Sequence, residues 1–494
     1  MSEAVDLQDL KRKSVRGGVV TMATQGLGIG IQLTSTVVLG RLLSPEDYGI
    51  MAMVMAVTAF AGLFRDLGLS AAAIQRQELS PAQQTNLFWL NTGVGALLTL
   101  ALVVAAPWVA GFYGKPEVRS VAMLVAGNFL IGSLGTQGGV LLLRQMQFGK
   151  KAVAEIAGSV VGLAISILLA LRGLSYWSLA WGGVASALVT TAALFLVSGF
   201  RPGLPQPGQR LEDMIRFGAS FTVFDIINYF HRNLDNLLIG RFCGPEPLGL
   251  YSRAYSLLML PINTLRNPIL SVGFPAMSRL QYDPENFRAY YLRVVHLMAL
   301  ASMPLTAFLL VATRPVVDLV LGPKWDALCP IFAVLATVAF VQPMVTTWGM
   351  VVQSRGQGRR YVQMGICNTL VSVAGFGAGL PWGPLGVATG YSVATYVSAV
   401  PLLHWAYRGT AIRLEDFFRE IAGPALASIL AGFCAAAVIR ILSDPTFLPA
   451  VRLAAGGAAF APAYLLFLWV MPGGKTDLGT IWGFVSARWI AKSA

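Results

Sequence analysis

The chain has 494 residues, of which 55% are hydrophobic and 12% are charged. A soluble domain carries about 25% charged residues, so this composition excludes an ordinary water-soluble protein and indicates a surface that faces lipid. The formal net charge of +13 does not indicate a nucleic-acid binder. The Lys and Arg residues concentrate in alternate connections between apolar segments, as the positive-inside rule describes for a membrane protein.

Apolar segments long enough to cross a bilayer, about 20 residues each, follow one another from about residue 17 to residue 471. The sequence therefore predicts an all-α integral membrane protein with about 14 transmembrane helices. The expected spans are residues 17–40, 48–70, 85–110, 118–142, 152–171, 176–199, 216–240, 249–275, 289–312, 327–352, 361–380, 384–407, 421–441 and 449–471. Their connections are short, which leaves no room for an extramembrane catalytic domain.

The spans are expected to form two pseudo-symmetric halves of six helices, followed by two extra helices. The expected divisions are a cytoplasmic lead-in at 1–15, an N-terminal half at 16–200, a Pro/Gly-rich cytoplasmic linker at 201–215, a C-terminal half at 216–410, spans 13 and 14 at 411–472, and a cytoplasmic tail at 473–494. An even number of spans, with basic residues on the same side, places both termini in the cytoplasm. The tail is either a short basic amphipathic helix on the inner surface or a frayed end.

An internal repeat supports this division. The string GRLLSPEDYG at residues 40–49 returns as GRFCGPEPLG at residues 240–249, and in each half it joins the first span to the second. Membrane proteins built from two such halves usually bind substrate between them and work by alternating access. The Pro and Gly residues of the string themselves favour a tight turn between helices over contact with substrate.

Three segments resemble one family of membrane transporters. They are the string at residues 40–49, the segment DLGLSAAAIQ at residues 66–75, and residues 228–280, which include RNLDNLLIG and LYSRAY. Together they resemble the Wzx-type polysaccharide flippases of the multidrug/oligosaccharidyl-lipid/polysaccharide exporter (MOP) superfamily, and most closely the colanic-acid-exporter-like subgroup. The resemblance covers about residues 10–440.

The resemblance implies a flippase of the bacterial inner membrane. Its substrate would be a polyprenyl-pyrophosphate-linked oligosaccharide repeat unit, moved across the membrane for lipopolysaccharide or exopolysaccharide biosynthesis. Membrane lipids and other polysaccharide assembly proteins, such as a polymerase or co-polymerase, are the further partners that it implies. It does not indicate which sugar is carried.

Polar side chains inside the expected spans predict the substrate cavity. Charged residues there cost about 2.5–3.5 kcal/mol each, and a hydrated cavity for a sugar pyrophosphate would account for them because arginine binds phosphate oxygens in pairs. The seventh span carries its polar residues three or four positions apart, on one helical face, and the first span has polar residues 200 positions earlier. The cavity candidates are Arg232, Arg266, Arg253, Arg65, Gln25, Gln32, Asn228, Tyr229 and Asn236.

Internal ion pairing is the alternative explanation for the same charges. Arg232 is placed to pair with Asp235 at a spacing of three, and Asp235 is assigned this structural role. Arg65 or Arg266 could likewise pair with Asp66. The sequence leaves both explanations open for the arginines.

Energy coupling is expected to depend on an ion or on the substrate gradient. The sequence has no Walker-type loop, no HExxH and no CxxC motif, so we expect no nucleotide, metal or other cofactor. Asp225 is the first coupling candidate because it lies near the middle of span 7, and burial raises the pKa of a carboxyl group. Glu155 and Asp66 are the others, whereas His231 is expected to be a packed, neutral side chain and His296 and His404 are weaker candidates for coupling.

Two other functions remain as alternatives. A cation-coupled drug exporter of the same superfamily would share the fold, but its pocket would carry fewer arginines and more carboxylates. A membrane polymerase for lipid-linked sugars would need a large outer loop with catalytic residues, which the short connections do not provide. We therefore expect a transporter that is not an enzyme.

Overall fold

The computed structural model describes residues 7–66, 68–76, 79–206, 229–230, 232–442, 444 and 447–485. In these residues all regular secondary structure is helical. The chain divides into two compact units, unit 1 (Met1–Gly249) and unit 2 (Leu250–Ala494). Each unit is described by itself.

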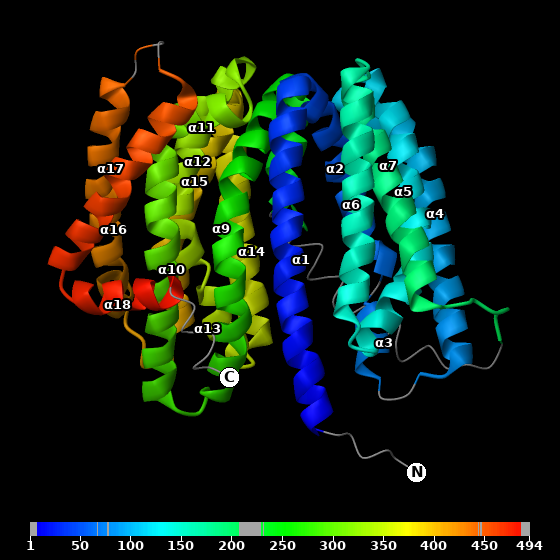
Figure 1. The fold of residues 1–494 in the computed structure, drawn as a ribbon, viewed down its shortest axis with the longest axis horizontal. Coiled ribbons are helices and arrows are strands. Elements are labelled where there is room, and N and C mark those ends of the chain that lie inside the picture. Colours follow the sequence, from blue (N-terminus) through cyan, green and yellow to red (C-terminus); the bar gives the residue numbers. More distant parts are fainter. Residues whose placement is uncertain are drawn as a thin grey trace. The chain divides into compact units, whose positions relative to one another are not determined.

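Unit 1 is a bundle of long helices. Its elements are α1 (Leu7–Leu42), α2 (Pro45–Asp66), α3 (Leu69–Gln75), α4 (Pro81–Tyr113), α5 (Pro116–Arg144), α6 (Phe148–Leu171), α7 (Ser175–Ser198), a helical stretch at 232–243 and the beginning of α9 (Pro245–Arg279). Helices α4, α5, α6 and α7 lie side by side, and α1 packs along α6 (Figure 1). Because most residues are apolar, these helices pack through one face and leave large apolar side chains exposed on the other, as lipid-facing helices do.

The boundary between α2 and α3 differs from the expected second span. That span was predicted to run to residue 70, but α2 ends at Asp66 and a separate short helix begins at Leu69. Gly68 lies between them with φ of +69°, a backbone conformation that glycine adopts without steric cost. The helix is therefore interrupted although the apolar character continues.

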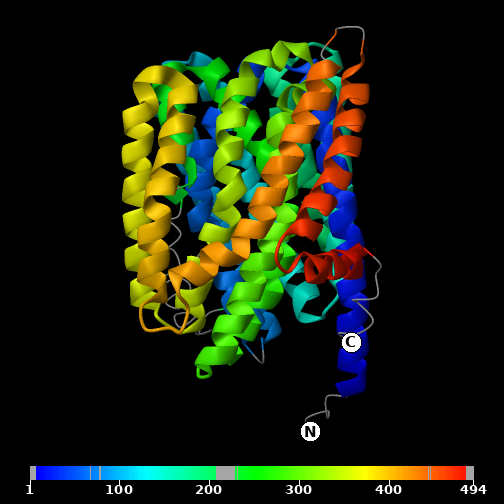
Figure 2. The same ribbon diagram turned by 90° about the vertical axis from the view of Figure 1, so that its left-hand side faces the viewer.

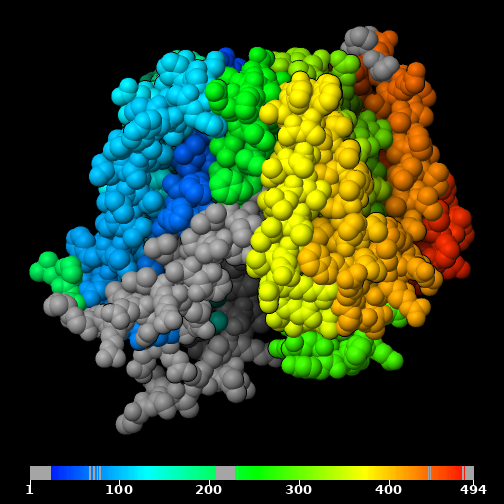
Figure 3. All heavy atoms as spheres, turned by 180° about the vertical axis from the view of Figure 1, so that it is seen from behind, coloured from blue at the N-terminus to red at the C-terminus, as the bar shows by residue number. Residues whose placement is uncertain are grey.

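Unit 2 contains the remaining helices. They are the rest of α9, α10 (Pro284–Val311), α11 (Thr313–Val320), η1 (Pro323–Leu328), α12 (Cys329–Val345), α13 (Trp348–Ser354), α14 (Gly358–Gly379), η2 (Leu380–Trp382), α15 (Gly383–Tyr407), α16 (Leu414–Ile441), α17 (Pro449–Val470) and α18 (Gly474–Val485). Helices α14 and α15 form an adjacent pair whose outer surface is yellow in Figure 3. Helix α18 runs crosswise to α16 and α17 (Figure 2), so the first part of the expected tail is a helix.

The main core of unit 2 lies where α10, α12, α13, α15 and α16 meet. Tyr291, Met344, Val351, Leu403 and Phe417 are all fully buried there. At one end of this core α10 and α16 are joined by a bidentate ion pair: Arg288 donates from Nε and Nη2 to the two carboxylate oxygens of Asp416, at 2.9 and 2.8 Å. Apolar burial and this pair together fix the two helices.

The structure confirms an all-α membrane protein. Ten segments of the described chain are long and apolar enough to cross a membrane, and one of them, residues 358–407, contains both α14 and α15. The first and eighth expected spans fall on α1 and α9, which are long helices but are not among those ten. Most of the seventh, residues 216–240, lies outside the described residues.

The repeated string makes a reciprocal contact inside unit 1. A Cβ atom on Gly49 would overlap the carbonyl group of Pro245, and a Cβ atom on Gly249 would overlap the carbonyl group of Pro45. Helix α2 and the beginning of α9 therefore approach each other backbone to backbone, which only glycine permits. Ser44 caps α2, since its hydroxyl oxygen accepts a hydrogen bond from the backbone N–H of Asp47 at 3.2 Å, and the Asp47 carboxylate accepts in return from the backbone N–H of Ser44 at 2.8 Å.

Candidate functional site

The structure describes part of the polar face predicted for the seventh span, here called the polar stripe. Tyr229 is buried, its hydroxyl donates a hydrogen bond to the carbonyl oxygen of Ala56, and its ring lies 5.2 Å from that of Phe60. Tyr229 therefore packs against α2. Asp225 and Asn228, predicted for the same stripe, lie outside the described residues.

The next turn of the stripe combines an exposed cation with buried polar groups. The Arg232 side chain is exposed. Asp235 is buried and accepts a hydrogen bond from the backbone N–H of Asn236 at 2.8 Å, while Oδ1 of Asn236 is buried without a hydrogen-bond partner in the described structure. A buried amide oxygen without a donor costs about 1–3 kcal/mol, so this is a place where a polar ligand group or water would stabilise the protein.

The other candidates of unit 1 lie at the surface. Gln25 and Gln32 are exposed on α1, and Arg65 is exposed at the end of α2, where its guanidinium lies close to Gly132 of α5. Asp66 ends α2, and its side chain is outside the described set. Glu155 is half exposed and forms an ion pair with Lys151 one turn earlier on α6.

Unit 2 carries Arg253 and Arg266, both on α9 and both partly buried. Nη2 of Arg266 donates to the hydroxyl of Thr346, at the end of α12, over 3.3 Å. The neighbouring Thr347 begins a buried chain of hydroxyl groups: its Oγ1 lies 2.7 Å from the hydroxyl of Tyr291, which lies 2.8 Å from the hydroxyl of Tyr407. The Arg266 guanidinium is thus held beside this row of buried hydroxyl groups, here called the polar seam, in an otherwise apolar core.

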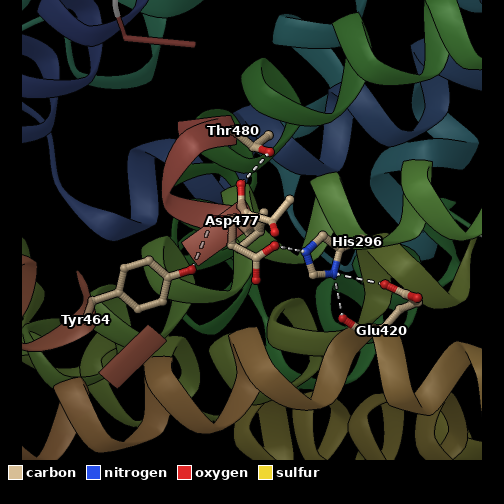
Figure 4. A network of polar contacts seen from close by, with 7 residues as sticks. His296, Glu420, Tyr464, Asp477 and Thr480 are labelled. Atoms are coloured by element: carbon tan, nitrogen blue, oxygen red, sulfur yellow. Dashed lines mark hydrogen bonds and ion pairs between the residues drawn. The ribbon is translucent and has the colours of Figure 1, made fainter. Parts of the chain in front are cut away.

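A second polar cluster in unit 2 joins three helices. His296 of α10 places Nδ1 2.9 Å from the backbone oxygen of Glu420 and 3.2 Å from its carboxylate, and Nε2 lies 2.8 Å from the carboxylate of Asp477 (Figure 4). A neutral imidazole carries one N–H, whereas the protonated ring donates from both nitrogens. Both contacts are hydrogen bonds at the same time when His296 is charged, and the cluster then fixes α18 against α10 and α16.

The His296 cluster was missed in the sequence, where His296 is only a weak candidate for coupling. Its partners are 124 and 181 positions away along the chain, and no spacing rule connects residues so far apart. The clue in the sequence was the presence of three ionisable residues, His296, Glu420 and Asp477, in or beside apolar segments. In the part of the chain that the structure describes, no cluster of His, Cys, Asp or Glu could hold a metal ion.

The fold is shared with a solved membrane protein. It is similar to the solved structure of the lipid II flippase MurJ in its inward closed conformation, with a TM-score of 0.74 over 92% of this chain and 98% of that one, at 14% sequence identity. A match of this quality at such low identity shows a shared fold of membrane-embedded helices.

The sequence comparisons then give the family. Residues 38–330, more than half of the chain, match the family described as polysaccharide biosynthesis protein, and the chain belongs to this family. It is 28% identical over 451 residues to the teichuronic acid biosynthesis protein TuaB of Bacillus subtilis (strain 168), covering 89% of this chain and 91% of TuaB. It is 24% identical over 414 residues to the lipopolysaccharide biosynthesis protein WzxC of Escherichia coli (strain K12), covering 81% and 83%. The resemblance to Wzx-type proteins is thereby confirmed.

Proposed function

We propose that this protein flips polyprenyl-pyrophosphate-linked oligosaccharide repeat units across the bacterial inner membrane for surface polysaccharide biosynthesis. The proposal rests on two similarities found in the same chain. Residues 38–330 match a polysaccharide biosynthesis family, and 92% of the chain has the fold of a lipid II flippase. A flippase is what such a pathway requires when its sugars are assembled on a lipid on one side of the membrane and used on the other. Other polysaccharide assembly proteins, such as a polymerase, are the partners that this role suggests.

The proposed architecture has fourteen spans. The two halves, residues 16–200 and 216–410, supply six spans each, spans 13 and 14 follow at 411–472, and both termini lie in the cytoplasm. Basic residues in alternate connections support this orientation. Alternating access, the usual mechanism of transporters built from two similar halves, is the mechanism that we assign.

The pyrophosphate is proposed to be held by arginines. Arg232 is exposed on the polar stripe, Arg65 is exposed at the end of α2, and Arg253 and Arg266 both belong to α9. Their planar guanidinium groups suit paired phosphate oxygens. The polar lining is assigned to Gln25, Gln32, Asn228 and Asn236, and Tyr229 positions the stripe through its contact with Ala56.

Coupling is proposed to use a proton or cation at Asp225, with Asp66 as the second candidate. Glu155 has a weaker claim because Lys151 already neutralises it at the surface. In proteoliposomes, Asp225→Asn is expected to abolish the dependence of transport on an imposed proton or sodium gradient, whereas Glu155→Gln keeps it. An unchanged gradient dependence in the Asp225 variant would rule out this carboxylate.

The decisive test of the function is the position of the lipid-linked precursor in a strain that lacks this chain. A membrane-impermeant sugar-binding probe applied to spheroplasts reports the precursor on the outer leaflet. The proposal predicts precursor accumulating on the cytoplasmic leaflet and loss of surface polysaccharide, with both restored by the intact gene. Precursor that reaches the outer leaflet normally would reject the flippase; a drug-sensitive strain would then favour the exporter, and unpolymerised outer precursor the polymerase.

A further inference from the structure

We propose that a basic cavity in unit 2, where α14 begins and α15 ends, binds the phosphate of an anionic lipid headgroup. The cavity has a volume of about 510 Å³. It is lined by Gly356, Gln357, Gly358, Arg359, Arg360, Gln363 and Trp405. The inference requires that the protein lies in a membrane and does not depend on the transported substrate.

Arg360 is held rigidly at the cavity. Its Nη1 donates to Oε1 of Gln357 at 2.9 Å and to the carbonyl oxygen of Arg408 at 3.1 Å, and its Nη2 donates to the carbonyl oxygen of Trp405. These contacts tie the first turn of α14 to the last turn of α15. Because they use neutral oxygens, they fix the guanidinium without cancelling its charge.

The cavity carries an excess of positive charge. The guanidinium groups of Arg355 and Arg408 lie close enough to Arg360 for their charges to repel it. Arg355 donates from Nη2 to the carbonyl oxygen of Gly409 at 2.7 Å, and its Nη1 is buried without a hydrogen-bond partner in the described structure. No carboxylate among the described residues forms an ion pair with Arg355, Arg359, Arg360 or Arg408. An anion would relieve the repulsion.

The surroundings favour a phosphate on a lipid. The Arg359 side chain is exposed at the cavity and is free to donate, and the first turn of a helix directs backbone N–H groups toward an anion. Trp405 lines the same cavity, and tryptophan is enriched at the depth of lipid headgroups. Two guanidinium groups beside an indole match the phosphate of an anionic phospholipid, or the pyrophosphate of a polyprenyl lipid, which has the same chemistry.

Native mass spectrometry of the purified full-length protein tests this site. The protein is mixed with phosphatidylglycerol or phosphatidylethanolamine, and farnesyl pyrophosphate serves as the probe for a polyprenyl source. The test variant is the double substitution Arg359→Ala with Gln363→Ala, since neither side chain makes a hydrogen bond or ion pair with the described residues. The matched control is Arg172→Ala, which removes an exposed arginine at the end of α6 in unit 1.

We expect the intact protein to bind its first phosphatidylglycerol about tenfold more tightly than phosphatidylethanolamine, because the net negative charge is what the arginines recognise. The double variant should lose this preference, and the Arg172 variant should keep it. Displacement of phosphatidylglycerol by farnesyl pyrophosphate would assign the site to polyprenyl lipids as well, whereas no displacement would restrict it to phospholipid. Equal binding of the two phospholipids, or an unchanged preference in the double variant, would overturn the proposal.

Discussion

Replacing Gly249 with leucine should leave almost no folded protein in the membrane. A Cβ atom at this position would overlap the carbonyl group of Pro45, and a backbone atom cannot move aside as a flexible side chain can. Overpacking a core typically costs about 1–3 kcal/mol, and more where the backbone must shift. We therefore expect a loss of at least about 3 kcal/mol, measured as the yield and melting temperature of the detergent-solubilised protein.

A matched substitution separates this close contact from a general effect of leucine. Gly93 lies inside α4, and apart from the backbone of its own helix no described atom lies within 4 Å of the position of its Cβ. Gly93→Leu should therefore retain the yield and melting temperature of the intact protein, and Gly49→Leu should fail as Gly249→Leu does. Normal folding of the Gly49 and Gly249 variants would show that α2 and α9 do not approach as closely as described.

Replacing Arg266 with alanine should reduce transport roughly 10- to 100-fold while the protein stays folded. A charge-assisted hydrogen bond contributes about 1.5–3 kcal/mol, which corresponds to this range in rate if Arg266 binds the pyrophosphate. Arg266→Lys keeps the charge but loses the planar fork, so we expect an intermediate rate. The measurement is the leaflet position of the precursor in a deletion strain that expresses each variant.

The control for Arg266 lies on the same helix. Arg279 is exposed at the end of α9, so Arg279→Ala removes an equal charge without touching the polar seam at Thr346. It should support normal transport. Normal translocation by a well-folded Arg266→Ala protein would show that Arg266 serves packing through its bond to Thr346 and does not hold substrate.

Most of the helices could be predicted from the sequence because a long apolar segment is enough to indicate a span. Where a helix breaks inside an apolar run, composition gives little warning: Gly68 ends α2 through its backbone angle, and the tenth expected span is divided into η1, α12 and α13. The repeated string was read as a structural turn, and its contact with its own copy favours that interpretation.

The candidate site was less accessible to sequence reasoning. Helical spacing identified Tyr229 as a member of the polar stripe, but spacing cannot show that its hydroxyl already has an acceptor in Ala56. The cluster at His296 and the cavity at Arg360 were missed because they form between segments far apart in the chain. Periodicity places side chains on a face of one helix, whereas a site depends on what the neighbouring helices bring to that face.

The reciprocal contact of the repeated string has a consequence for how the two copies can change over time. The positions that touch, Pro45 with Gly249 and Pro245 with Gly49, are identical in both copies. Of the other positions, some have diverged, as Leu43 and Cys243 show, and some are unchanged, as Glu46 and Glu246 show. After a duplication, one copy is usually free to drift because the other keeps the original role. Here each copy packs against the other, so a change at a contact position of one copy also disturbs the other copy. Neither copy is free to change at these positions.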